Sequence, residues 1–193
     1  MSQVVSFNKI NNFSDQINSV KIGVISDTHI PDRTEHIPQA VLNAFKQVDL
    51  IIHAGDIISL GVIDELKSVC PKVVVVAGNM DQEAVRKKYP VKQVLEILGQ
   101  RVGLMHGAGS AAHLLELLND AFKEDDCDLI IFGHSHKAMN ELIGKVLFFN
   151  PGSATDPAVA YNSYGVIELK KKLTDSGSAA NNQGRIEGKI IKI

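Results

Sequence analysis

Residues 129–136 read Leu-Ile-Ile-Phe-Gly-His-Ser-His, which is a short apolar run followed by a glycine and two histidines. Four other segments share this form, in which a β-type run stops at Gly or Ser near an Asp, His or Asn; they are residues 24–29 (Val-Ile-Ser-Asp-Thr-His), 50–56 (Leu-Ile-Ile-His-Ala-Gly-Asp), 74–79 (Val-Val-Val-Ala-Gly-Asn) and 102–107 (Val-Gly-Leu-Met-His-Gly). In open α/β sheets, ligands bind beyond the carboxyl ends of the strands, which is where these segments place their polar side chains. The five segments therefore predict one metal-binding site at one edge of a sheet.

Strand-like and helix-like runs alternate in the first half of the chain, and strands follow one another in the second half. We expect strands near residues 20–26, 49–54, 72–77, 101–106, 128–133, 145–149, 163–169 and 185–193. Apolar residues at helical spacing predict helices near 38–47, 59–69, 81–88 and 110–124. Continuously apolar early strands are typical of parallel pairing, whereas the late strands suggest antiparallel pairing. This pattern predicts an α/β fold of two packed β-sheets flanked by helices.

The length of 193 residues predicts one domain. Residues 1–19 are polar, and we expect a flexible N-terminal extension there, with an extra helix packed by Phe7, Ile10, Phe13 and Ile17 as the alternative. A single domain would then occupy residues 20–193. Residues 174–184 are expected to form a surface loop between the last two strands.

Composition excludes several classes of function. The net charge is −2, and Lys170–Lys172 is the only basic run, so no nucleic-acid surface is evident. No apolar run approaches the roughly 18 residues of a membrane span, and the N-terminus lacks the pattern of a secretory signal. Cys70 and Cys127 make no disulfide framework. By elimination we expect a cytoplasmic protein, and the sequence leaves a homo-oligomer open.

The candidate metal ligands at these strand ends carry oxygen and nitrogen donors in a mixed set. They are Asp27, His29, Asp56, Asn79, His106, His134 and His136. Each has an ordinary explanation when taken alone, such as a helix cap, a turn or a buried histidine. Together they exceed the needs of one tetrahedral zinc and suit two six-coordinate ions, with one carboxylate bridging them.

The order of these motifs resembles the calcineurin-like metallophosphoesterases, in particular their small single-domain phosphodiesterase branch, from about residue 21 to 169. The segment 150–153 (Asn-Pro-Gly-Ser) also fits that branch. The resemblance implies a four-layer α/β/β/α sandwich that binds two divalent metal ions, with manganese expected first and nickel, iron, cobalt, zinc or magnesium as alternatives. It also implies that Asp27, His29 and His136 hold the first ion, that Asn79, His106 and His134 hold the second, and that Asp56 bridges.

The activity implied by the resemblance is hydrolysis of a small phosphodiester or other phosphate ester by a hydroxide that bridges the two ions. Many relatives have a histidine directly after the Asn, where it can protonate the leaving group, but this chain has Met80. The proton would then come from Asp81, His36 or water, and Asp81 alternatively caps the following helix. Asn79 could also orient the phosphate, and Arg33 and His36 are candidate substrate contacts, although an exposed arginine is the ordinary alternative.

A second function stays open from the sequence. Residues 26–31 and 150–155 also resemble the retromer subunit of this fold, which implies a protein-interaction scaffold with little or no catalysis. That subunit has lost part of the ligand set, whereas this chain keeps all seven residues, and the complete set favours catalysis. A structural protein with one metal ion would leave several of these ligands unexplained.

Overall fold

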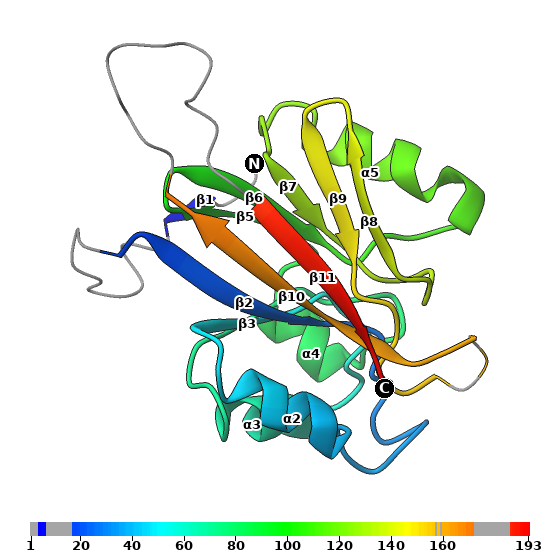
Figure 1. Cartoon of the computed structure of the whole chain (residues 1–193). Helices are drawn as coiled ribbons and strands as arrows, with labels where there is room; N and C mark the ends of the chain where they lie inside the picture. Colours follow the sequence, from blue (N-terminus) through cyan, green and yellow to red (C-terminus); the bar gives the residue numbers. More distant parts are fainter. Residues whose placement is uncertain (1–3, 7–16, 157, 159, 172–185) are drawn as a thin grey trace, which may run out of the picture.

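The computed structural model describes residues 4–6, 17–156, 158, 160–171 and 186–193. Two mixed β-sheets face each other, with α2, α3 and α4 outside one sheet and α5 outside the other (Figure 1). This arrangement confirms the predicted α/β fold of two packed sheets flanked by helices. The space between the sheets is filled by apolar side chains from both, among them Val24, Ile52, Leu104 and Phe149.

The first sheet has the strand order β11-β10-β2-β3-β4. Its members are β2 (Ser19–Ile25), β3 (Leu50–His53), β4 (Val73–Val75), β10 (Ser163–Lys170) and β11 (Ile186–Lys192). Strands β2, β3 and β4 are parallel, as their apolar runs predicted, whereas β10 is antiparallel to both β2 and β11. The carboxyl ends of β2, β3 and β4 therefore point to the same edge.

The second sheet has the order β1-β5-β6-β7-β9-β8. Its members are β1 (Val4–Ser6), β5 (Lys92–Ile97), β6 (Gln100–Met105), β7 (Leu129–Ile131), β8 (Met139–Ile143) and β9 (Val146–Asn150). Strands β6, β7 and β9 are parallel, so the expected antiparallel pairing is correct for β9 against β8 and wrong for β9 against β7. Strands β1, β5 and β8 were not expected, and β8 returns the chain so that β9 runs in the direction of β7.

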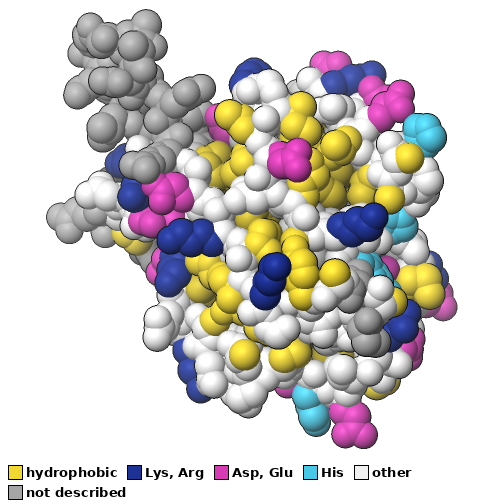
Figure 2. Space-filling view, turned by 45° about the vertical axis from the view of Figure 1, so that its right-hand side comes forward, with side chains coloured by type: hydrophobic (Ala, Val, Ile, Leu, Met, Phe, Trp, Pro, Cys, Tyr) yellow, Lys and Arg dark blue, Asp and Glu magenta, His cyan; other side chains and the backbone are white. Residues whose placement is uncertain are grey.

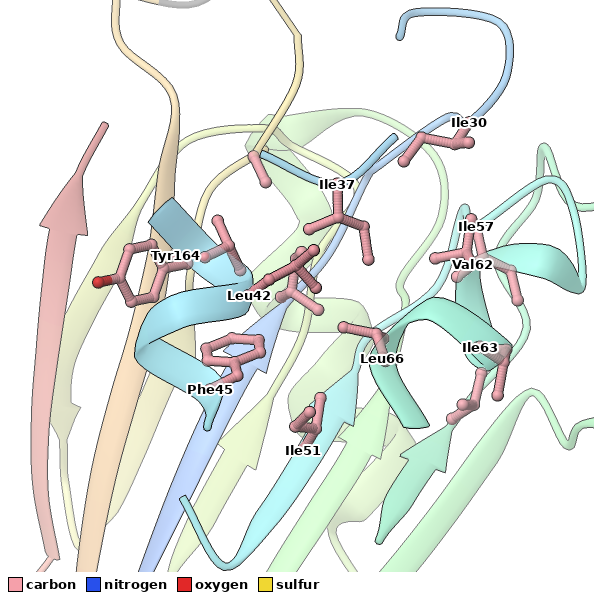
Figure 3. Close-up of a cluster of buried hydrophobic side chains, with 14 of the residues drawn as sticks. Ile30, Ile37, Leu42, Phe45, Ile51, Ile57, Val62, Ile63, Leu66 and Tyr164 are labelled. Atoms are coloured by element: carbon pink, nitrogen blue, oxygen red, sulfur yellow. The ribbon is translucent and has the colours of Figure 1, made fainter. Parts of the chain in front are cut away.

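The helices lie close to their predicted positions. They are α2 (Gln39–Phe45), α3 (Gly61–Lys67), α4 (Glu83–Lys88), a 3-10 turn η1 (Ala111–His113) and α5 (Leu114–Phe122). Figure 3 shows Phe45 of α2 and Leu66 of α3 pointing toward Ile51 of β3, within one buried apolar cluster. A Cβ atom on Gly23 would lie 2.7 Å from the ring of Phe45, so the glycine in β2 lets α2 pack closely on the sheet.

The expected N-terminal extension is described only in part. Residues 4–6 form β1, parallel to β5, and Ile17 packs against the core between the sheets. The alternative helix through Phe7, Ile10 and Phe13 and the loop at 174–184 lie outside the described residues. In the described part of the chain, no helix has the length and apolar character needed to cross a membrane.

Candidate metal centre

The predicted ligands come from both sheets and meet at one end of the molecule. Asp27 and His29 follow β2, Asp56 follows β3, and Asn79 follows β4 in the first sheet. In the second sheet, His106 directly follows β6, while His134 and His136 follow β7. The carboxyl ends of these strands hold the side chains beside a cavity of about 430 Å³, lined by His29, Asp32, Arg33, Asp56, Asn79, Met80, His134 and His136.

Asp27, His29 and His136 form a first cluster, whose ligand atoms all lie within 4.8 Å of one another. The Nε2 atom of His136 is 3.2 Å from Asp27 Oδ1 and 3.2 Å from His29 Nε2. The hydrogen bond to Asp27, together with the carboxylate of Asp156 on the other side of the ring, raises the pKa of His136 to about 9. Burial lowers the pKa of His29, which favours the neutral ring that can coordinate a metal.

Asp27, Asp56 and His106 form a second cluster of the same kind. The Nδ1–H of His106 donates to the carbonyl of Ala54 at 2.7 Å, so Nε2 is the atom that carries the free lone pair in the neutral ring. This Nε2 atom lies 3.2 Å from Asp56 Oδ2 and 3.7 Å from Asp27 Oδ1. It is buried without a hydrogen-bond donor, and leaving a buried polar atom unsatisfied is costly. A divalent cation would satisfy this atom and both carboxylates, so the residues fit a metal ion.

His134 and Asn79 lie beside this second cluster. The Nε2–H of His134 donates to the carbonyl of Gly109 at 2.7 Å, and its Nδ1 faces Asn79 Oδ1 at 2.9 Å. The ring centroids of His134 and His106 are 5.4 Å apart. The lone pair of His134 Nδ1 and the amide oxygen of Asn79 lie next to each other, and both atom types can coordinate one cation. All seven predicted ligands are thus brought together, and Asp27 lies between the two clusters.

The backbone at this site adopts an uncommon conformation. Asp27, His29, Asp56, His134 and His136 have positive φ angles of 52°, 45°, 55°, 68° and 55°. Residues other than glycine avoid this region, and such strain tends to gather at functional sites. Ile58, which is β-branched, also has a φ of 66°. Five of the seven ligands are therefore held by backbone turns that the surrounding structure must stabilise.

Asp81 supplies part of that stabilisation. It is 1% exposed, and its carboxylate accepts hydrogen bonds from the N–H groups of Asp56 (3.1 Å), Ile58 (2.6 Å) and Gly78 (2.7 Å). Burial raises the pKa of its carboxyl group, against these hydrogen bonds. The expectation that Asp81 caps the following helix was wrong, because the N-cap of α4 is Gln82 and no side chain caps it.

Residues 150–155 were noted only as a motif, and the contacts of the segment 150–156 were missed. Asn150 donates to the carbonyl of Gly133 at 2.8 Å, and Ser153 Oγ–H donates to the carbonyl of Asp27 at 2.7 Å. Thr155 Oγ–H donates to the carbonyl of Thr28 at 2.7 Å, and Asp156 accepts from His136 Nδ1–H. The segment therefore connects the loops after β2 and β7. The sequence signal was the family resemblance of residues 150–155, whereas nothing local marks Asp156.

The remaining candidates differ in position. Arg33 and Met80 line the metal-site cavity, and Met80 is 58% exposed. His36 instead lines a neighbouring cavity with Ile30 and Pro31, and its Nδ1 lies 3.8 Å from Glu65 Oε1. His53 is buried, and its Nε2 lies 3.0 Å from Thr28 Oγ1 while its Nδ1 accepts from the N–H of Gly55 at 3.2 Å, so it supports two ligand loops from behind.

The fold and this site define a class of protein. Residues 20–172 match the calcineurin-like phosphoesterase superfamily domain. The chain belongs to the calcineurin-like phosphoesterases.

Individual relatives are similar to this chain over most of their own length. A probable metallophosphoesterase of Methanothermobacter thermautotrophicus is 39% identical over 155 residues, which is 80% of this chain and 89% of that protein. Phosphodiesterase MJ0936 of Methanocaldococcus jannaschii is 29% identical over 168 residues, covering 79% and 95% of the two chains. The crystal structure of Vps29 from Entamoeba histolytica, complexed with zinc, is 26% identical with a TM-score of 0.64, covering 89% and 98%.

Proposed function

We propose that this chain is a metal-dependent phosphodiesterase that uses two divalent cations to hydrolyse a small phosphodiester or related phosphate ester. The observation that carries the proposal is the pair of Asp/His clusters that share Asp27 beside an open cavity. Family membership and a relative named as a phosphodiesterase support the same reaction class.

The ligand assignment keeps the order that the family resemblance implies, although Asp27 is the carboxylate that the two clusters share. Asp27, His29 and His136 would hold the first ion, and His106, Asn79 and His134 the second. Asp56 would bridge, because its Oδ2 lies 3.2 Å from His106 Nε2 and 3.8 Å from His29 Nε2. When bound, such a pair of ions supplies a hydroxide nucleophile at neutral pH and neutralises charge on the phosphate. Manganese is the first choice, although this donor set also accepts nickel, iron, cobalt, zinc or magnesium.

The chain's own residues would bind and orient the ester. Arg33 reaches the cavity from the loop after β2 and can pair with a phosphate oxygen. Asn79 can orient the phosphate through its amide. Among the described residues that line the cavity, Arg33 is the one Arg or Lys. A single basic side chain suits a phosphodiester, which carries one negative charge.

The leaving group would depart without a side-chain acid. Both carboxylate oxygens of Asp81 accept backbone N–H groups, and His36 lines a different cavity. Met80 occupies the exposed position beside Asn79, and a thioether donates no proton. Water is therefore the proton source in this proposal, and esters with good leaving groups should react best.

A protein-interaction scaffold is the second candidate. Similarity to Vps29 supports it, as do the exposed apolar side chains of Leu142 and Ile143 on the edge strand β8. Figure 2 shows apolar side chains exposed among Lys or Arg side chains on the face that carries β8 and β11. The complete ligand set favours the enzyme, because an interaction surface needs no hydroxide.

The two candidates are separated by metal reconstitution. The protein is stripped of metal and supplied with Mn²⁺, Ni²⁺ or Mg²⁺, and hydrolysis of bis-p-nitrophenyl phosphate and p-nitrophenyl phosphate is compared. The proposal predicts metal-dependent turnover that is faster with the diester. Two bound ions without turnover of either compound would favour the scaffold.

A further inference from the structure

We propose that Asp156 is a positioning residue that orients His136 toward the first metal ion and connects that ligand to Arg33. This inference rests on the proposed function, since it assigns a role around the same cavity. Asp156 lies outside the predicted ligand set, and its carboxylate contacts both a proposed ligand and a proposed substrate contact.

The Asp156 side chain is buried and held from several directions. It is 3% exposed, although it lies next to an open cavity. Its own N–H donates to Ser153 Oγ at 2.9 Å, and its Oδ1 accepts from the N–H of Ala158 at 2.9 Å. Ser153 in turn donates to the carbonyl of Asp27. The carboxylate is thus fixed relative to the loop that carries the first two ligands.

The bond from His136 to Asp156 determines which ring nitrogen faces the cluster. The Nδ1–H of His136 donates to Asp156 Oδ2, so the lone pair of the neutral ring lies on Nε2. That atom faces Asp27 Oδ1 and His29 Nε2, each at 3.2 Å. A carboxylate behind a metal-bound histidine fixes the orientation of the ring and increases its basicity. The backbone of His136 also has a positive φ of 55°, so the contact with Asp156 helps to hold a ligand in an uncommon conformation.

The second oxygen of Asp156 faces the substrate side of the cavity. Its Oδ1 lies 3.9 Å from Arg33 Nη1, and the Arg33 side chain is 46% exposed. An exposed arginine loses much rotamer freedom when it is held in one position, so a nearby buried carboxylate lowers that cost. One carboxylate therefore links the ligand of the first ion to the cation proposed to bind phosphate.

The test is a Mn²⁺ titration followed by EPR, without substrate, on the full-length protein and its variants. Asp156→Asn is nearly isosteric but removes the charge and one acceptor oxygen. We expect it to weaken the binding of one Mn²⁺ ion by about 10–100-fold, which is typical for residues behind a metal ligand. In a His136→Ala background, the same substitution should have little further effect, because the two residues act as one unit.

Asp32→Asn is the charge control, since Asp32 lines the cavity and is exposed. It removes the same charge without touching His136, so its effect on Mn²⁺ affinity should be much smaller because of solvent screening. At saturating Mn²⁺, Asp156→Asn should raise KM for bis-p-nitrophenyl phosphate as Arg33→Gln does, with a smaller change in kcat.

Two results would overturn the role of Asp156. One is an equal loss of Mn²⁺ affinity in Asp156→Asn and Asp32→Asn, and the other is the same loss with and without His136. Wild-type protein that binds two Mn²⁺ ions without hydrolysing any ester would overturn the proposed function alone, because the affinity measurements would still test Asp156. Wild-type protein that binds no Mn²⁺ would overturn both.

Discussion

The carboxylate of Asp81 accepts a hydrogen bond from the backbone N–H of Asp56 at 3.1 Å, from a position directly behind the proposed bridging ligand. Asp56 makes a second hydrogen bond between the same two loops, because its Oδ1 accepts from the N–H of Met80 at 2.8 Å. Each loop therefore holds the other. This arrangement leaves Asp56 Oδ2 directed at His106 and stabilises a turn in which Asp56 and Ile58 have positive φ angles.

Asp81→Asn should destabilise the protein, because an amide nitrogen would replace one acceptor and leave a buried N–H unsatisfied. The expected loss is about 1–3 kcal/mol in the free energy of unfolding, measured by urea denaturation of the metal-free protein. Asp49→Asn is the matched control, since Asp49 also accepts a backbone N–H, from Lys21, but at an exposed site. Unchanged stability together with lost turnover would instead indicate that Asp81 acts as the acid.

Gly78→Ala should disrupt the site by displacing Asp56. A Cβ atom there would lie 2.1 Å from Asp56 Oδ1 and 2.5 Å from Asp56 N, so the loop must move. Because displacements of about 1 Å can cost about 100-fold in rate, we expect turnover to fall by at least that factor. Gly61→Ala is the control, since its Cβ would meet Ser59 Oγ at an ordinary 3.5 Å and turnover should be retained. Normal turnover in Gly78→Ala would contradict the close packing of the two loops.

Met80→His should restore a proton donor at the cavity. Met80 is exposed and lines the same cavity as His134 and His136, so a histidine there can reach a departing oxygen. A well-placed general acid contributes about 10²–10⁴-fold, and we expect a gain near the lower end for alkyl esters and little gain for p-nitrophenyl esters. Met80→Gln controls for polarity. An equal effect of both variants on all esters would argue against an unassisted leaving group.

The contribution of His53 and His136 to the free energy of unfolding of the metal-free protein should be largest near pH 6.5. Burial lowers the pKa of His53 to about 3, so the unfolded state binds a proton that the folded state does not, and stability rises from about pH 3 to 6.5. The pKa of His136 is raised to about 9, so its contribution is complete below pH 6.5 and is lost as the pH rises to about 9. Urea unfolding between pH 4 and 9 measures both effects.

His136→Gln is the comparison for this pH profile. It should reduce the decline in stability above pH 6.5, to which His106 also contributes because its pKa is raised by Asp56 and Asp27. The rise below that pH should persist because His53 is intact. The same proton competes with metal, so Mn²⁺ binding to the wild type should release about one proton from His136 at pH 7.5. A wild-type profile that runs parallel to that of His136→Gln above pH 6.5 would contradict the raised pKa.

The seven candidate ligands and the two-sheet fold were predictable because local signals agreed. An apolar run followed by a glycine or serine and a polar residue, as at Gly133 and His134, marks a strand end whichever sheet the strand joins. Parallel strands end at one edge, so the topology brought Asp27, Asp56 and Asn79 together. Strand β5 was missed because its Lys92 and Gln93 dilute the apolar pattern, and β8 was missed because most of its side chains are exposed.

The supporting contacts were not predictable from local sequence. Asp156 meets His136 across 20 residues, and Asp81 meets Ile58 across 23, so neither partner is marked by spacing. Asp81 stands just before a helix and resembles a cap, yet its carboxylate turns to a neighbouring loop. Tertiary packing decides between such local alternatives, since one buried carboxylate can satisfy several N–H groups there.

The most direct test of the central claim is a titration of Mn²⁺ into the metal-stripped protein, in which bound ions and turnover of bis-p-nitrophenyl phosphate are measured in the same samples. A dinuclear phosphodiesterase predicts that turnover rises mainly with the second bound ion. It also predicts that Asp56→Asn, which weakens the proposed bridge, loses occupancy and turnover by orders of magnitude. Full turnover with one bound ion, or two bound ions without turnover, would contradict the account.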